Sequence, residues 1–137
     1  MSSIFTQIIR GDIPCHFIAE DDHFFSFLDI SPIAPGHTLV IPKVETDRFF
    51  DLDPTILAHY LPFAQSIAKA LESTFDCDRI GMVVAGLDVP HAHLHLIPIR
   101  SIDDLNMKNA QPETNNILST TATTIRNTLD SIAPQKK

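Results

Sequence analysis

Three of the seven histidines of this chain stand at alternate positions in one apolar stretch, Val89-Pro90-His91-Ala92-His93-Leu94-His95-Leu96-Ile97-Pro98. A strand sends successive side chains to opposite faces, so we expect His91, His93 and His95 to line one face of a strand. The apolar residues between them would line the other face and pack into a core. The stretch therefore predicts a strand with one apolar face and one chemically active face.

Three interpretations of the histidine face are open on spacing alone. The histidines could form a pH-sensitive ladder with no ligand, although imidazoles titrate near neutrality and repel one another when protonated. Neighbouring imidazoles could instead share a zinc ion whose open fourth position would be catalytic. One neutral imidazole could also act as a nucleophile, while flanking groups hold its tautomer and bind the developing negative charge. The choice between the last two depends on the rest of the chain.

Length and composition limit the class of protein. With 137 residues and a mass of 15.2 kDa, the chain fits one compact domain spanning residues 1–137. Hydrophobic residues make up 44% and charged residues 20% of the sequence, with a mean hydropathy of +0.07, as in ordinary globular proteins. The sequence contains neither an apolar run of about eighteen residues nor a charged and apolar leader at its start. We therefore expect no membrane association and a cytoplasmic location.

The net charge and the cysteine spacing argue against a nucleic-acid-binding protein and against a disulfide-bonded one. The formal net charge of −7 opposes binding to nucleic-acid backbones, which depends on clustered Lys and Arg. Any phosphate that the protein handles should belong to a small molecule. Cys15 and Cys77 lie far apart with no C-x-x-C spacing, so reduced thiols are expected rather than a disulfide.

Hydrophobic periodicity predicts three helices. A short helix carries apolar residues at i and i+4 from Ile4 to Ile9, and Gly11 is placed to end it. A long helix should begin at Asp53-Pro54, and Pro62 inside it should kink or divide it. The third helix is an amphipathic extension over roughly residues 112–133.

Five segments have the aromatic, β-branched or alternating character of strands. Prolines, glycines and acidic residues separate them, which is typical of an antiparallel meander. The segment 80–85 has the composition of a buried strand, and the histidine stretch should pair with it. The predicted strands are residues 17–19, 23–28, 37–41, 80–85 and the histidine stretch.

The segment His91-Ala92-His93-Leu94-His95-Leu96-Ile97 resembles the signature of the histidine triad family, in which three histidines alternate with hydrophobic residues. Residues 4–14, 27–32 and 35–43 are similar to the other sequence blocks of that family, in the same order. The resemblance covers nearly the first hundred residues.

This resemblance implies an α+β fold. Its five-stranded antiparallel sheet would have a long helix packed on it, together with a short N-terminal helix and a C-terminal helix. It also implies a protein, usually a homodimer, that binds a small-molecule nucleotide and cleaves it at the α-phosphorus without a cofactor or metal. The middle histidine, His93, would be the nucleophile that forms a nucleotidyl-imidazole intermediate.

The resemblance also assigns roles to the other histidines. A backbone carbonyl near His91 would hold the second ring proton of the nucleophile, so His91 would orient rather than react. His95 could donate to a phosphate oxygen or to the leaving group. His37 would support His91 from the adjoining strand.

Substrate contacts follow from the same resemblance. Asp29 matches the acidic residue that accepts hydrogen bonds from the ribose hydroxyls. Apolar residues match the walls of the base pocket, although each would be equally at home in a core. They are Ile4, Phe5, Ile8, Phe27, Leu28 and Ile30.

The chain departs from the family pattern in two places. The loop before the triad is shortened to residues 85–88, with Leu87 in the position of a phosphate-binding glutamine and with Asp88, whose charge repels phosphate unless it binds through its backbone. Some members carry a zinc site built on C-x-x-C, but Ser3 and Thr6 stand at those positions. Glu45 stands where many relatives have a histidine after Ile-Pro-Lys, so that second site is absent too. We expect no structural zinc.

The expected function is hydrolysis or transfer of an adenylated or related nucleotide. The sequence leaves open the choice between a phosphoramidate and a dinucleoside polyphosphate as substrate. A nucleotide-binding or regulatory module with little turnover is the alternative, supported by the polar groups missing from the loop. A zinc-dependent hydrolase that uses the His-x-His pair is a more distant alternative.

Overall fold

A computed structural model describes residues 2–132 of the chain. Within these residues the chain forms three α-helices, five strands and three short 3-10 helices. The helices and strands are α1 (Ile4–Arg10), β1 (Phe17–Glu20), β2 (Phe24–Leu28), β3 (Thr38–Pro42), α2 (Pro54–Thr74), β4 (Arg79–Val83), β5 (Leu94–Ile99) and α3 (Asn115–Ile132).

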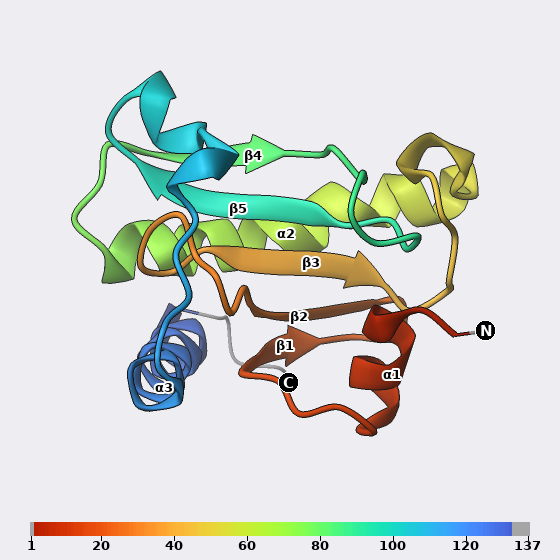
Figure 1. Cartoon of the computed structure of the whole chain (residues 1–137), viewed down its shortest axis with the longest axis horizontal. Helices are drawn as coiled ribbons and strands as arrows, with labels where there is room; N and C mark the ends of the chain where they lie inside the picture. The colour runs from red at the N-terminus through yellow and green to blue at the C-terminus, as the bar shows by residue number, and fades with distance from the viewer. Residues whose placement is uncertain (1, 133–137) are drawn as a thin grey trace.

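The strands form one antiparallel sheet in the order β1-β2-β3-β5-β4 (Figure 1). The first three strands follow one another, whereas β5 lies between β3 and β4. This order places β5, which contains the second half of the histidine stretch, inside the sheet between β3 and the edge strand β4. The five-stranded α+β architecture expected from the sequence is confirmed.

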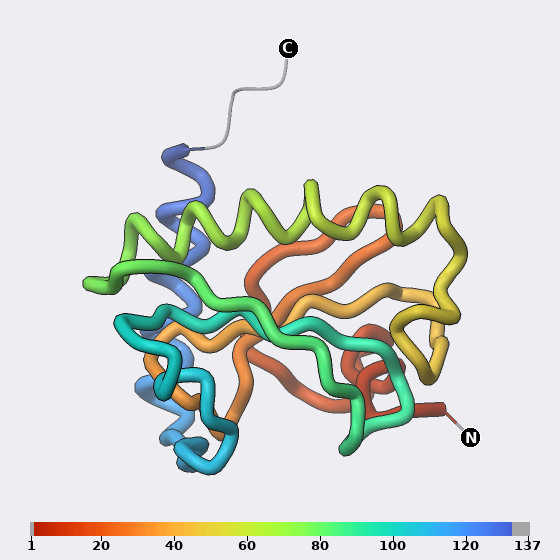
Figure 2. The backbone as a smooth tube through the Cα atoms, turned by 90° about the horizontal axis from the view of Figure 1, so that it is seen from above, coloured from red at the N-terminus to blue at the C-terminus, as the bar shows by residue number. Residues whose placement is uncertain are grey.

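The helices cover the sheet from different sides. The long helix α2 lies along one face, α1 lies on the other, and α3 crosses one end of the sheet (Figure 2). Alternate residues of the central strands therefore enter two separate cores. The core under α2 includes Val40, Leu94 and Leu96, and the smaller core under α1 includes Phe5 and Leu39.

Local signals account for the ends of the helices. Ser3 caps α1, and Gly11 ends it in the left-handed region with φ of 86°. The Asp53 carboxylate accepts a hydrogen bond from the backbone N–H of Thr55 at the start of α2. Pro62 does not divide α2, because the carbonyl that it leaves without a partner, that of Ala58, lies on the exposed side of the helix.

Two strand predictions need correction. β5 begins at Leu94, so His91 and His93 precede the strand rather than lying within it. The β3–β5 register would place Ala92 opposite Pro42, which has no N–H to continue the ladder, and Ala92 instead donates to the Thr46 carbonyl.

The second correction concerns β4, which is an edge strand rather than a buried one. Only Gly81 is buried there. Ile80 packs against the core under α2 while Met82 is exposed, and composition alone does not distinguish this edge position from burial on both faces.

The C-terminal extension predicted over residues 112–133 corresponds to α3, and residue 133 lies outside the described part of the chain. None of the helices between residues 2 and 132 combines the length and apolarity needed to cross a bilayer.

Candidate active site

A cavity of about 280 Å³ lies between α1, the end of β2 and the histidine stretch. Ten of the residues that the sequence singled out line it: Ile4, Phe5, Ile8, Phe27, Leu28, Asp29, Ile30, Asp88, His93 and His95. The sequence reasoning missed five more: Ile13, Pro14, Cys15, Leu39 and Val89. Of these, Leu39 was detectable, because alternation along β3 places it on the same face as His37.

His93 has only one ring nitrogen available to a ligand. Its Nδ1 lies 2.8 Å from the backbone carbonyl oxygen of His91. A carbonyl only accepts, so Nδ1 carries a proton that it donates there, and Nε2 is the ring nitrogen left without this contact. The Phe5 ring packs edge-on against the His93 ring, with 5.1 Å between centroids. The backbone and α1 together orient the His93 ring so that Nε2 is the nitrogen free to face a ligand.

His91 lies behind His93 and does not line the cavity. It is fully buried, and its Nε2 donates to the Pro42 carbonyl at 2.8 Å. Its Nδ1 is therefore an acceptor, and the Ser3 hydroxyl lies 2.7 Å away. Burial lowers the pKa of His91 and keeps the ring neutral. The His91 carbonyl contacts His93, and the orienting role expected of His91 stays a prediction.

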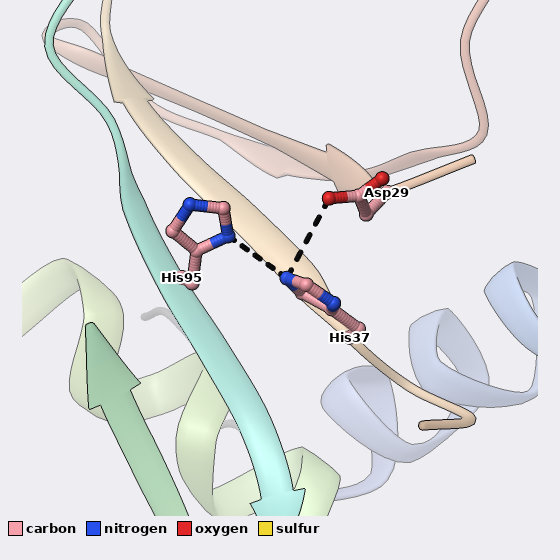
Figure 3. A group of neighbouring side chains, drawn as sticks. All are labelled: Asp29, His37 and His95. Carbon is pink, nitrogen blue, oxygen red and sulfur yellow. Dashed lines mark hydrogen bonds and ion pairs between the residues drawn. The ribbon is translucent and has the colours of Figure 1, made fainter. Parts of the chain in front are cut away.

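His37 contacts His95, not His91, so the expected pairing is wrong (Figure 3). The register pairs Leu39 with His95, which brings His37 close to His95 on the same face. His91 lies near Pro42, at the other end of β3. The family motif identified His37 as a site residue but did not identify His95 as its hydrogen-bond partner.

A chain of hydrogen bonds determines the tautomers of both rings. The backbone N–H of Ile33 donates to Nδ1 of His37 at 3.0 Å, so the proton of His37 is on Nε2. That proton is donated to Nδ1 of His95, 2.8 Å away. His95 must then carry its own proton on Nε2. This N–H is available as a donor to a ligand in the cavity.

Burial keeps this pair of histidines neutral. It lowers the pKa of His37 to about 4, and burial together with the neighbouring His37 lowers that of His95 to about 4. Burial also raises the pKa of Asp29, while the Ser31 N–H, which donates to its Oδ1 at 2.9 Å, acts in the opposite direction. Oδ2 of Asp29 lies 3.6 Å from His37 Nε2. Asp29 keeps acceptor capacity toward the cavity.

Among residues 2–132, one group of side chains is close enough to hold a metal ion: Asp29, His37 and His95, with ligand atoms within 4.8 Å of one another. It contains only one triad histidine. The facing nitrogens of its two rings already share a hydrogen bond. Both ring nitrogens of His91 are also engaged, so the geometry gives no support to a zinc site built on the His-x-His pair.

The position of the zinc site found in some relatives holds different chemistry here. Hydroxyl groups of Ser3 and Thr6 lie beside Nδ1 of His91, and the Thr6 hydroxyl donates to the Glu45 carboxylate at 2.6 Å. Zinc in proteins prefers thiolate, imidazole and carboxylate ligands. With hydroxyls in two positions, this donor set does not fit a structural zinc ion.

The shortened loop exposes one residue and directs another to the cavity. Gly86 adopts a left-handed conformation with φ of 74°, and the Leu87 side chain is 91% exposed. The neighbouring Asp88 lines the cavity with His93 and His95. The loop therefore brings a carboxylate, rather than an amide, toward the histidines.

An antiparallel sheet with three alternating histidines at the start of an inner strand, two of which line a largely apolar cavity together with Asp29 and Asp88, defines a distinct class of protein. The HIT domain model matches residues 10–102. The chain belongs to the histidine triad (HIT) family.

Relatives and solved structures agree with this assignment. Adenosine 5'-monophosphoramidase hnt1 of Schizosaccharomyces pombe is 37% identical over 99 residues, which cover 72% of this chain and 74% of that protein. A Hit-like protein involved in cell-cycle regulation from Bartonella henselae has a TM-score of 0.81 and 35% identity, covering 93% of this chain and 96% of that one. A zinc-bound histidine triad family protein from Mycobacterium smegmatis has a TM-score of 0.83 and 31% identity, covering 96% of each chain.

Proposed function

We propose that this protein is a nucleotidyl hydrolase or transferase that cleaves an adenylated or related nucleotide at its α-phosphorus. The observation that carries the proposal is the 2.8 Å contact between His93 Nδ1 and the His91 carbonyl, which leaves Nε2 as the ring nitrogen that can reach a substrate. A neutral imidazole held in one tautomer is a suitable nucleophile for phosphorus.

In the proposed first step, His93 Nε2 attacks the α-phosphorus. A P–N bond forms, the bond from phosphorus to the leaving group breaks, and the leaving group departs with that electron pair while it accepts a hydrogen bond from the Nε2–H of His95 and takes its proton from solvent water. In the second step, water attacks the phosphorus of the nucleotidyl-imidazole and releases a proton to solvent, and the P–N bond breaks to return the electron pair to His93 Nε2. The proton chain from Ile33 through His37 supports this role, because it keeps the His95 proton on Nε2.

The cavity supports a nucleoside as the bound part of the substrate. Apolar residues of α1 and β2 form most of its wall and would hold the base, as the sequence predicted. Asp29 would accept hydrogen bonds from both ribose hydroxyls. The α-phosphate would then lie toward His93 and His95, which line the same cavity.

Asp88 favours a phosphoramidate over a dinucleoside polyphosphate. Its carboxylate lines the cavity with the two histidines, where a chain of phosphates would meet like charge. The amine released from a phosphoramidate carries no such negative charge. The monophosphoramidase named among the relatives, 37% identical to this chain, supports the same choice.

The test mixes the protein with adenosine 5'-phosphoramidate or with a diadenosine polyphosphate and follows intact mass and AMP release. We expect an adenylyl adduct on rapid quenching, absent in His93→Ala, and faster turnover of the phosphoramidate. His59→Ala is the control, because that histidine is exposed on α2.

Other outcomes would contradict the proposal. Tight nucleotide binding without turnover of either substrate would favour the regulatory module. Activity lost to a chelator and restored by zinc would favour the metal-dependent hydrolase. An adduct that persists in His93→Ala would remove His93 from the role of nucleophile.

We also propose that two copies of the chain pair along β4. This antiparallel edge strand can hydrogen-bond to its own copy across a two-fold axis. Leu61 of α2 and Met82 of β4 are 56% and 52% exposed, and both line an apolar groove. Light scattering should give a dimer for the wild type and a monomer for Met82→Lys. Ile117→Lys on α3, where the side chain is 51% exposed, is the control and should remain dimeric.

A further inference from the structure

Four polar side chains meet at the first turn of α1, outside the substrate cavity. Ser3 Oγ lies 2.7 Å from His91 Nδ1 and accepts the Thr6 backbone N–H at 3.1 Å. The Thr6 hydroxyl donates to Glu45 Oε1 at 2.6 Å, and the same oxygen accepts the Ser3 backbone N–H at 2.8 Å. We call these residues, Ser3, Thr6, Glu45 and His91, the α1 cluster.

The direction of each hydrogen bond in the α1 cluster follows from its partners. His91 Nε2 must donate, because the Pro42 carbonyl that it faces can only accept. In the neutral ring Nδ1 is then an acceptor, so the single proton of the Ser3 hydroxyl is donated to it. Ser3 Oγ serves two partners at once, accepting from the helix and donating to the histidine.

The exposed end of the α1 cluster is a carboxylate. Hydrogen bonds from the Thr6 hydroxyl and the Ser3 N–H lower the pKa of Glu45, so it stays ionised. This single oxygen holds both the backbone and the first turn of α1. The cluster thus joins α1 to the loop after β3 and to the fully buried His91 ring.

Two features connect the α1 cluster to His93. The carbonyl that holds Nδ1 of His93 belongs to His91, whose ring the cluster holds. Phe5, in the same turn of α1, packs edge-on against both rings, with centroid distances of 5.7 Å to His91 and 5.1 Å to His93. A displacement of this turn would therefore move both groups that orient the His93 ring.

We propose that Ser3 and Glu45 are positioning residues: they hold His91 in its Nε2–H tautomer through the Ser3 hydroxyl, and thereby keep the His91 carbonyl directed at His93. In this chain the contacts that hold the His91 ring to Ser3, and Ser3 and Thr6 to Glu45, are hydrogen bonds. The proposal deepens the proposed function, because it names residues that act on the nucleophile without touching the substrate.

The test uses two substitutions at Ser3 that separate capping from donation. Ser3→Asp keeps an acceptor for the Thr6 N–H but has no proton for His91 Nδ1, whereas Ser3→Thr keeps both functions. The ¹⁵N chemical shifts of His91 report directly which ring nitrogens carry protons. This measurement does not depend on turnover, so it stands even if the proposed function fails.

We expect the Nε2–H tautomer of His91 in the wild type and in Ser3→Thr. Ser3→Asp should give His91 protonated on both nitrogens, because the new carboxylate accepts from Nδ1. Its kcat should fall about 10-fold with KM changed less than about 2-fold, since Ser3 and His91 do not line the cavity. Ser3→Thr should retain most of the wild-type kcat.

A matched pair at Glu45 tests the other end of the α1 cluster if a Ser3 variant fails to fold. Glu45→Gln keeps an oxygen that accepts from Thr6 and Ser3 and should retain wild-type kcat within about 2-fold. Glu45→Ala removes that acceptor and should lower kcat about 5-fold. Wild-type His91 shifts in folded Ser3→Asp, or equal kcat in both Glu45 variants, would overturn the proposal.

Discussion

Leu94 and His93 are neighbours in the chain, yet they face opposite layers of the molecule. Leu94 is 1% exposed in the core under α2, where any apolar group of similar size and shape would serve. His93 is almost as buried, at 5%, but it depends on a specific carbonyl and a specific aromatic ring. Burial alone therefore does not separate a packing face from a reactive face. The difference lies in how many directed contacts each side chain requires.

The largest expected effects separate the two faces directly. Leu94→Ala should lower the free energy of unfolding by about 3 kcal/mol, because it leaves a cavity in a closed core. His93→Ala should lower turnover at least about 1,000-fold with a much smaller change in stability. Urea unfolding and AMP release measure the two effects. Leu94→Met is the control for volume. Equal stability losses in Leu94→Ala and His93→Ala would mean that the two side chains contribute alike to packing.

A pH titration tests whether the buried pair His37 and His95 is neutral in the folded protein. Burial places the folded pKa of His37 and His95 at about 4, below the unfolded value of about 6.5. The unfolded chain therefore binds more protons between these values, and this stability is complete above about pH 6.5. It should be lost between about pH 6.5 and pH 4, at up to about 1.4 kcal/mol per pH unit for each histidine.

Urea unfolding at pH 7, 6 and 5 measures that slope, and His37→Gln should make it shallower because one titrating group is removed. His59→Gln, on the exposed side of α2, should leave the slope unchanged. A free energy of unfolding that does not change between pH 7 and pH 5 would contradict the neutral, buried pair.

Substitutions at His37 test the proton chain behind His95. His37→Leu removes the donor to His95 Nδ1 and should lower kcat about 10-fold, because His95 is then free to place its proton on the wrong nitrogen. His37→Gln offers an amide N–H and should recover part of the loss. Steady-state kinetics with the phosphoramidate measures both. If the leucine variant turns over as fast as the glutamine variant, His37 only fills space.

The smallest expected effect concerns the aromatic contact on His93. Phe5→Leu keeps an apolar side chain in the cavity wall but loses the edge contact with the imidazole, so kcat should fall about 3-fold. Phe17→Leu removes an aromatic pair with Phe25, neither of which lines the cavity, and is the control. A similar fall in both variants would mean that packing in general, rather than the contact with His93, sets the rate.

Much of the fold could be predicted because its signals are local. Alternation along the histidine stretch gave the two faces of β5, and Asp53-Pro54 and Gly11 gave two helix ends, each from neighbours in sequence. The same signals failed where a distant partner decides. Composition could not show that β4 is the edge strand, and it could not show that Pro42 ends the pairing before His93.

Alternation, capping signals and the family motifs were enough to predict the family, the sheet and ten of the fifteen residues that line the cavity. Only the tertiary structure decided which atoms bond: His37 to His95 across 58 residues, and Ser3 to His91 across 88. The physical reason is that alternation and capping depend on adjacent residues, whereas the tautomer of a buried imidazole depends on which donor or acceptor the strand register brings within 3 Å.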